Sequence, residues 1–295
     1  MKQFIRDKSK QHFISSYVVQ AGQKGITTIK NIIAIASGKG GVGKSTTAVN
    51  LALALYKLGA EVGLLDADIH GPNQPIMLGV YEKPKISSNK KFIPLRQHGI
   101  QSISIGYLID MQTPTIWRGP MVSQALQQLV YETLWEDLDF LILDLPPGTG
   151  DTPLTLAKKV PLAGAIIVTT PQKVAVIDAS KALMMFEKLG ITILGIIENM
   201  TIYKCPHCKH EETIFGNGGG KRMAESSDIP LLGQIPFNIT VRKNSDRGIP
   251  TVIADPDSSI AKIYQDIASK LVEQLSLQPI NYGIKFPNIV VEKIK

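Results

Sequence analysis

The chain has 295 residues, 44% of them hydrophobic, which is enough to bury the core of one large α/β domain. No apolar run reaches the length of a membrane span and no apolar signal core follows the basic N-terminus, so we expect no membrane partner, no secretion and a cytoplasmic location. The net charge of +7 lies in residues 1–30 and 281–295, and the neutral remainder argues against nucleic-acid binding, which needs basic charge on the folded domain.

Predicted strands and helices alternate along the chain. We expect a flexible basic arm over 1–28, one domain over 29–278 and a tail over 279–295. Within the domain we predict, in order, a strand over 31–36, a helix over 45–56, a strand over 61–66, an irregular segment over 70–98, a strand over 101–105, a helix over 121–135, strands over 140–144 and 164–169, a helix over 174–189, strands over 191–197 and 231–235, and a helix over 258–275. This alternation predicts an α/β fold with a doubly wound, mostly parallel sheet.

A glycine-rich loop joins the first predicted strand to the first predicted helix. Its sequence fits the phosphate-loop pattern, in which two glycines bracket four residues and Lys-Ser follows. Glycines let several backbone N–H groups point at one phosphate chain, and the helix N-terminus adds partial positive charge. We therefore expect ATP to bind to Gly38, Lys39, Gly40, Gly41, Val42, Gly43, Lys44, Ser45 and Thr46.

Two lysines in this loop have different expected roles. Lys44 should reach the β- and γ-phosphates, and the hydroxyl of Ser45 should ligate Mg²⁺. Lys39 comes one position after the first glycine, where an ordinary phosphate loop needs no lysine. This surplus lysine suggests a second role beyond holding the nucleotide.

Three aspartates stand where predicted apolar strands end, which is the ligand-binding edge of an open α/β sheet. Asp144 ends one strand and precedes a Pro-Pro-Gly segment, an arrangement that resembles a Walker B strand followed by a switch that senses the γ-phosphate at Gly148. We expect Asp144 to hold Mg²⁺ through water. Asp66 and Asp68 follow another strand, and Asp68 is the candidate for orienting the attacking water because it lies further into the loop.

The two cysteines of the chain, Cys205 and Cys208, form a Cys-Pro-His-Cys loop with charged neighbours. This setting favours a metal knuckle over a redox pair, and zinc or iron–sulfur sites usually need four ligands. His207 and His210 could supply the missing half. A simpler completion is the same cysteine pair from a second copy across a two-fold axis, which predicts a homodimer.

Together these residues resemble the Mrp/ApbC family of iron–sulfur cluster carrier ATPases, within the MinD/ParA class of deviant Walker A proteins. The resemblance covers about residues 28–275. Its motifs are the loop 38–45, Asp-Ala-Asp-Ile-His-Gly-Pro at 66–72, Trp-Arg-Gly-Pro-Met at 117–121, Leu-Pro-Pro-Gly-Thr-Gly-Asp at 145–151, and the Cys-Pro-His-Cys loop before Ile-Phe-Gly at 214–216. It implies a MinD-like (SIMIBI) P-loop NTPase fold with a CxxC metal loop.

The resemblance also implies roles for particular residues. Lys39 would reach the phosphates of ATP bound to the partner subunit, whereas Asn199 and the Pro236–Phe237 segment would lie near the adenine. Cys205 and Cys208 of two subunits would bridge one [4Fe–4S] cluster, which passes to apo-proteins as clients. ATP hydrolysis would be coupled to that transfer, with Lys39, Lys44 and Asp68 as the catalytic residues.

Other functions compete with cluster transfer. One is a MinD/ParA-like positioning ATPase, although the tail contains Gly283 and Pro287 and does not read as an amphipathic membrane helix. A second is a zinc-bridged dimeric ATPase without cluster transfer. A third is a zinc-bridged targeting factor for hydrophobic helices, which would need a Met-rich insertion, whereas Met184 and Met185 are expected to pack in the core.

Overall fold

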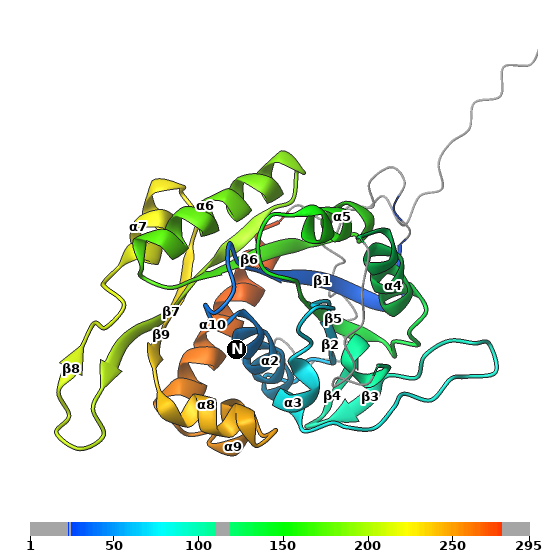
Figure 1. The fold of residues 1–295 in the computed structure, drawn as a ribbon, viewed down its shortest axis with the longest axis horizontal. Coiled ribbons are helices and arrows are strands. Elements are labelled where there is room, and N and C mark those ends of the chain that lie inside the picture. The colour runs from blue at the N-terminus through cyan, green and yellow to red at the C-terminus, as the bar shows by residue number, and fades with distance from the viewer. Residues whose placement is uncertain (1–22, 24, 110–118, 279–295) are drawn as a thin grey trace, which may run out of the picture.

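Parallel strands form the centre of the molecule, with helices on both faces (Figure 1). The structure is a computed structural model that describes residues 23, 25–109 and 119–278. The arm 1–22, residue 24, Trp117 and Arg118 of the third motif, and the tail 279–295 therefore lie outside the described residues.

The described strands join in one nine-stranded sheet with the order β3-β4-β2-β5-β1-β6-β7-β8, and β9 also pairs with β7. All pairings are parallel except those of β3 with β4 and of β7 with β8. The strands are β1 (Ile29–Ala36), β2 (Val62–Asp66), β3 (Leu95–Gln97), β4 (Ile100–Ser104), β5 (Leu138–Asp144), β6 (Gly164–Thr169), β7 (Ile193–Lys204), β8 (Glu211–Glu212) and β9 (Leu231–Phe237).

Two layers of helices cover the sheet. In Figure 1, α4 to α7 lie along one face, and α2 and α10 lie on the other with the shorter α3, α8 and α9 beside them. Their bounds are α2 (Lys44–Lys57), α3 (Gln74–Leu78), α4 (Gly119–Tyr131), α5 (Asp151–Lys159), α6 (Lys173–Lys188), α7 (Gly219–Ser226), α8 (Ile239–Asp246), α9 (Thr251–Ala254) and α10 (Ser259–Ser276), with a 3₁₀ turn, η1, at Ile105–Tyr107.

Burial on both faces explains the apolar sequences of the central strands. In β1, the run Ile32–Ile35 is fully buried, as expected for a parallel strand between two helical layers. Helix α2 is also buried over most of its length because it packs between the sheet and α10. The predicted doubly wound, mostly parallel sheet is confirmed.

The differences from prediction lie in polar segments and at element ends. The segment 70–98, expected to be irregular, contains α3, β3 and an antiparallel bridge between Ile86 and Phe92. The helix predicted to reach residue 135 ends at Tyr131, because Thr133 pairs instead with Phe92. The strand predicted over 191–197 continues as β7 to residue 204, through polar residues that an apolar run does not reveal.

The expectation for the two neighbouring methionines is wrong for one of them. Met184 is 49% exposed on α6, whereas Met185 is partly buried against the core. A helix turns by about 100° per residue, so adjacent side chains point to different sides. The pair therefore does not form a joint core contact.

Strand register brings the predicted site residues to one edge. Ser104 of β4 pairs with Asp66 of β2, which pairs with Asp144 of β5, which pairs with Ile35 of β1. Because these strands are parallel, their carboxyl ends meet at the same level. The loop that follows β1 begins at this edge, so both aspartates lie beside it.

Candidate functional site

The glycine-rich loop is held from two sides. On one side, Gly38 packs against the backbone of α6, so closely that a Cβ there would lie 2.0 Å from the carbonyl carbon of Asp178. On the other side, the side-chain amide of Asn199 donates to the Val42 carbonyl at 2.9 Å. Gly43 has φ +82° and a Cβ on it would lie 2.2 Å from Nδ2 of Asn199. The loop therefore needs glycine at both positions.

Lys44 lies at the start of α2 and is buried beside Asp144. Its Nζ donates to Oδ1 of Asp144 and lies 3.3 Å from the Ser45 hydroxyl. The Lys44 ammonium thus contacts the Asp144 carboxylate in this structure. A bound phosphate chain would compete with that carboxylate for the ammonium. The predicted phosphate, magnesium and Walker B residues are brought together at the end of β5.

Asp66 is fully buried and accepts several hydrogen bonds. The backbone N–H groups of Asp68 and Gln74 donate to it at 3.2 and 3.1 Å, and the Ser104 hydroxyl donates at 3.0 Å. Burial and the nearby charge of Asp144 raise the pKa of Asp66 to about 7, although the hydrogen bonds and Lys44 oppose that rise. This pair of carboxylates therefore shares a low-dielectric site that favours a cation between them.

Asp68 is only partly buried, two residues beyond the end of β2. Burial raises its pKa, and the charge of Lys44 acts in the opposite direction. Asp68 therefore lies within electrostatic reach of Lys44. Its role in orienting water stays a prediction.

The donor set at this edge fits Mg²⁺. Two carboxylates and the Ser45 hydroxyl are hard oxygen donors, which Mg²⁺ prefers, and no sulfur or imidazole stands among them. A divalent cation would also relieve the charge repulsion between Asp66 and Asp144.

The predicted switch contacts the start of the loop, and the surplus lysine lies within the loop. Gly148 has φ +91°, and its N–H donates to the Ser37 carbonyl at 2.9 Å. Lys39 is partly exposed, and within the described part of the chain its ammonium makes no hydrogen bond or ion pair. This ammonium is therefore available to a group outside the described residues.

The residues expected near the adenine gather where β7 and β9 pair. Asn199 pairs in register with Ile235, which is next to Pro236. The Phe237 ring lies 6.1 Å from the Tyr203 ring and 5.9 Å from the Phe215 ring, measured between ring centroids. Both polar ends of the Asn199 side chain are already bonded, to Val42 and to the N–H of Met200, so contact with adenine stays a prediction.

The cysteine loop connects β7 to β8, in a hairpin that extends beyond the helical layers in Figure 1. The N–H of Cys205 donates to the His210 carbonyl at 2.9 Å, and the N–H of Lys209 donates to the Cys205 carbonyl at 3.0 Å. Cys208 is exposed. Backbone N–H groups of Cys208 and His207 donate to the Cys205 sulfur and lower the pKa of this thiol, which favours the metal-binding thiolate.

The two histidines of the loop do not complete a metal site. Among the described residues, no group of three or more His, Cys, Asp or Glu side chains is placed to hold one ion. The completion of the cysteine site by His207 and His210, which the sequence left open, is therefore not formed in this structure.

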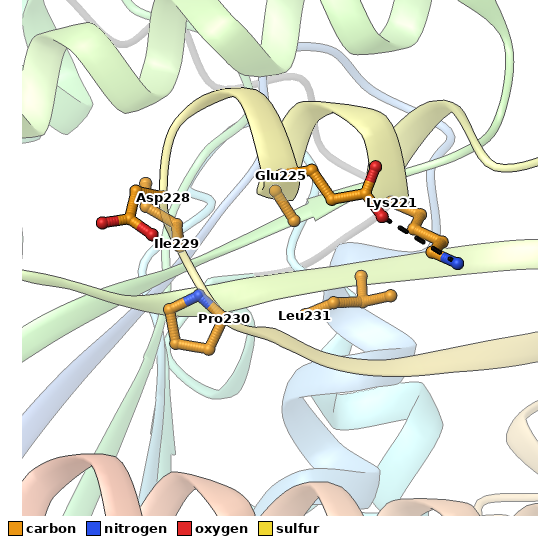
Figure 2. Close-up of a pocket in the computed structure, with 7 residues that line it drawn as sticks. Lys221, Glu225, Asp228, Ile229, Pro230 and Leu231 are labelled. Carbon is orange, nitrogen blue, oxygen red and sulfur yellow. Dashed lines mark ion pairs between the residues drawn. The ribbon is translucent and has the colours of Figure 1, made fainter.

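A separate surface pocket of about 400 Å³ lies where α7 meets the start of β9 (Figure 2). The side chains of Lys221 and Glu225 form an ion pair at its rim, with 3.9 Å between nitrogen and oxygen. None of the residues predicted for nucleotide or metal binding lines this pocket. It is lined by Lys221, Ala224, Glu225, Asp228, Ile229, Pro230 and Leu231.

Sequence reasoning missed two residues that build the nucleotide site. Gln74 contacts Asp144 and the backbone of Ser45, but it lies in the segment expected to be irregular. Ser104 bonds to Asp66 from the end of a neighbouring strand, and only the strand order reveals that contact. No helix in the described part of the chain is long and apolar enough to cross a membrane.

Comparison with known proteins gives a consistent result. A family model described as ParA, NUBPL iron-transfer P-loop NTPase, matches residues 28–272. The iron–sulfur cluster carrier protein of Pseudomonas fragi is 53% identical over 257 residues, covering 86% of this chain and 90% of that protein.

Solved structures agree with this assignment. The nucleotide-binding protein of Archaeoglobus fulgidus in complex with ADP has a TM-score of 0.69 and 34% identity, covering 80% of this chain and 93% of that one. The septum site-determining protein MinD of Pyrococcus horikoshii, complexed with Mg-ADP, has a TM-score of 0.61 and 25% identity, covering 84% and 97%. With its phosphate loop and paired aspartates at the end of a matching sheet, the chain belongs to the ParA family of P-loop NTPases, in the group of the NUBPL iron-transfer proteins.

Proposed function

We propose that this protein is an ATP-binding and ATP-hydrolysing carrier that holds a [4Fe–4S] cluster between two copies of the chain and transfers it to apo-proteins. The observation that carries the proposal is the position of two sites on one strand, β7. Asn199 binds the phosphate loop, and Cys205 follows the end of the same strand. The names of the family and of the Pseudomonas fragi relative support iron–sulfur clusters as the cargo.

The chemistry at the nucleotide site follows from the residues that surround it. The loop N–H groups and Lys44 would bind the β- and γ-phosphates, and Ser45 and Asp144 would hold Mg²⁺, which supplies charge stabilisation for phosphoryl transfer. Asp68 would orient the attacking water. The ADP and Mg-ADP complexes of the two solved relatives support this assignment of ligands.

Two features in and near the loop support a homodimer. Lys39 has no partner within the described residues, and it follows Gly38, which packs on α6. On α6 the apolar side chains of Val174 and Ile177 are 62% and 48% exposed, a composition that suits an interface. We propose that Lys39 reaches the ATP of the partner subunit, so that ATP draws the copies together.

The strand β7 offers a physical link between nucleotide and cluster. Cys205 lies six positions after Asn199, about 20 Å of extended chain. Between them, Met200 has φ +57° and the pairing with β9 shifts register, so this strand has a local irregularity next to the phosphate loop. We propose that rearrangement of the loop on hydrolysis alters this strand and the access to the cysteines.

Reconstitution without oxygen tests the cargo. The wild-type protein should bind about four irons per dimer with the visible absorption of a [4Fe–4S] cluster, because two cysteines from each copy make four ligands. Cys208→Ala should bind none. His207→Ala is the matched control and should keep the iron, since His207 is not grouped with the cysteines.

One outcome would favour the second candidate. The cysteine pair, of which Cys208 is exposed and Cys205 partly buried, also suits zinc, which four thiolates bind tetrahedrally. If protein purified without oxygen contains stoichiometric zinc and takes up no iron, the chain is a zinc-bridged ATPase and the carrier function is wrong.

A further inference from the structure

Gln74 connects three elements of the nucleotide site. Its side chain is 1% exposed, and Nε2 donates to the Ser45 carbonyl of α2 at 3.0 Å and to Oδ2 of Asp144 in β5 at 2.8 Å. Its backbone N–H donates to Asp66 at the end of β2. Among the described side chains, only Gln74 and Lys44 form hydrogen bonds both to α2 and to the carboxylate of Asp144.

The other end of the same amide has no partner. Oε1 of Gln74 is buried and accepts no hydrogen bond within the described residues. Exchanging the amide oxygen and nitrogen would not help, because both neighbours of Nε2 are acceptors. Buried polar atoms without a partner are rare, and an acceptor such as Oε1 is free to bond a donor from outside the described residues.

The contact between Lys44 and Asp144 makes Gln74 more important when nucleotide binds. The carboxylate of Asp144 has two side-chain partners here, Lys44 on Oδ1 and Gln74 on Oδ2. If Lys44 leaves to bind phosphate, Gln74 is the remaining side chain that fixes the carboxylate. Its donor group thus orients Asp144 at the stage when a cation must replace the ammonium.

We propose that Gln74 is a positioning residue for Mg²⁺. Its Nε2 holds the carboxylate of Asp144 in place, and its Oε1 accepts a hydrogen bond from a water molecule that the metal brings. This inference rests on the proposed Mg²⁺–ATP site. Gln74 lies outside the phosphate loop and is not one of the aspartates. Its proposed role affects the affinity for Mg²⁺ rather than the affinity for the nucleotide.

Gln74→Met tests the proposal, because methionine has a similar length and volume but neither donates nor accepts a strong hydrogen bond. Nucleotide binding is measured by calorimetry, first in EDTA and then over a Mg²⁺ titration. In EDTA the affinity for ADP should stay within about twofold of wild type. The Mg²⁺ concentration for half-saturation should rise about tenfold or more, the effect of losing one hydrogen bond to a charged group.

Gln101→Met is the matched control. Gln101 is equally buried, but both ends of its amide are bonded, to the backbone carbonyl and N–H of Glu136. This variant should lower the melting temperature and leave the Mg²⁺ half-saturation unchanged. If Gln74→Met does not fold, Gln74→Asn, whose amide is one carbon too short to reach, should show the same rise.

The outcomes separate this inference from the proposed function. A Gln74 variant with the wild-type Mg²⁺ half-saturation, or with ADP affinity reduced equally in EDTA and in Mg²⁺, would mean that Gln74 has a structural role only. A wild-type protein that binds nucleotide without any dependence on Mg²⁺ would instead contradict the Mg²⁺–ATP site itself.

Discussion

At the scale of single residues, the nucleotide site is governed by buried charge. Lys44, Asp66 and Asp144 lie together with little or no exposure to water, where an unpaired charge is costly. The structure compensates with hydrogen bonds from Gln74, Ser104 and the backbone, and by raising the pKa of one carboxyl group. We therefore expect the stability of this site to depend on cations and on pH.

The pKa of Asp66 predicts how stability depends on pH. In the native state Asp66 keeps its proton up to about pH 7, whereas in the unfolded chain it releases the proton near 3.8, the ordinary pKa of an aspartate side chain. Between these values the native state binds more protons, so the free energy of unfolding of the metal-free protein should fall as pH rises from about 4 to about 7 and level off above that. Chemical denaturation at a series of pH values measures this.

Asp66→Asn is the control for this prediction, because its side chain does not titrate. The decrease between about pH 4 and pH 7 should be smaller in this variant than in wild type. Equal slopes in the two proteins would show that Asp66 does not carry a native-state proton in that range.

At the scale of elements, β7 joins the phosphate loop to the cysteine hairpin. Its first part is buried between β6 and β9, and its last residues pair with β8 next to the cysteines. The side chain of Asn199 ties the strand to the loop at Val42, which is itself buried. Loop order should therefore depend on this one contact between strand and loop.

Asn199→Ala tests that dependence. The variant leaves the Val42 carbonyl without its donor, so the free energy of unfolding should fall by about 1–3 kcal/mol and ADP affinity should fall with it. Asn31→Ala is the control, because Asn31 is also buried and its amide also donates to a backbone carbonyl, that of Asp139. It should lose stability but keep ADP affinity. If Asn199→Ala and Asn31→Ala both bind ADP as tightly as the wild-type protein, β7 has no role in holding the loop.

At the scale of the whole molecule, several features point outward to a second copy. The two cysteines would supply two of the four ligands of the proposed cluster, and the Lys39 ammonium has no partner within the described residues. Exposed apolar side chains of α6 lie next to the loop that carries this lysine. These features of the described residues agree with the proposed homodimer.

Lys39→Ala tests the contribution of the second copy. ATP affinity should stay within about twofold, whereas the turnover rate should fall at least about tenfold, because charge stabilisation from the partner is lost. Sedimentation should also show less ATP-dependent dimer. Lys181→Ala removes a lysine from the exposed surface of α6, where it pairs with Asp178, and should change neither measurement. Wild-type turnover in the Lys39 variant would exclude the cross-subunit role.

The sequence by itself determined the sheet and the phosphate-binding edge. Apolar runs identify strands buried on both faces, and parallel strands place Asp66 and Asp144 at one edge together with Lys44. The glycine pattern of residues 38–43 likewise identifies the loop, because glycine allows the close contact at Gly38 and the positive φ angles at Gly41 and Gly43.

Only the tertiary structure decided which other side chains reach that edge. Gln74 lies in a short helix within a segment rich in proline and glycine, and no periodic pattern distinguishes it. Asn199 contacts a loop 157 residues away along the chain. The extent of β7 and the hairpin that carries the cysteines were also hidden, since polar residues form strands there through pairing with β8 and β9. Local patterns record burial and turns, whereas contacts between distant segments depend on how the strands are ordered.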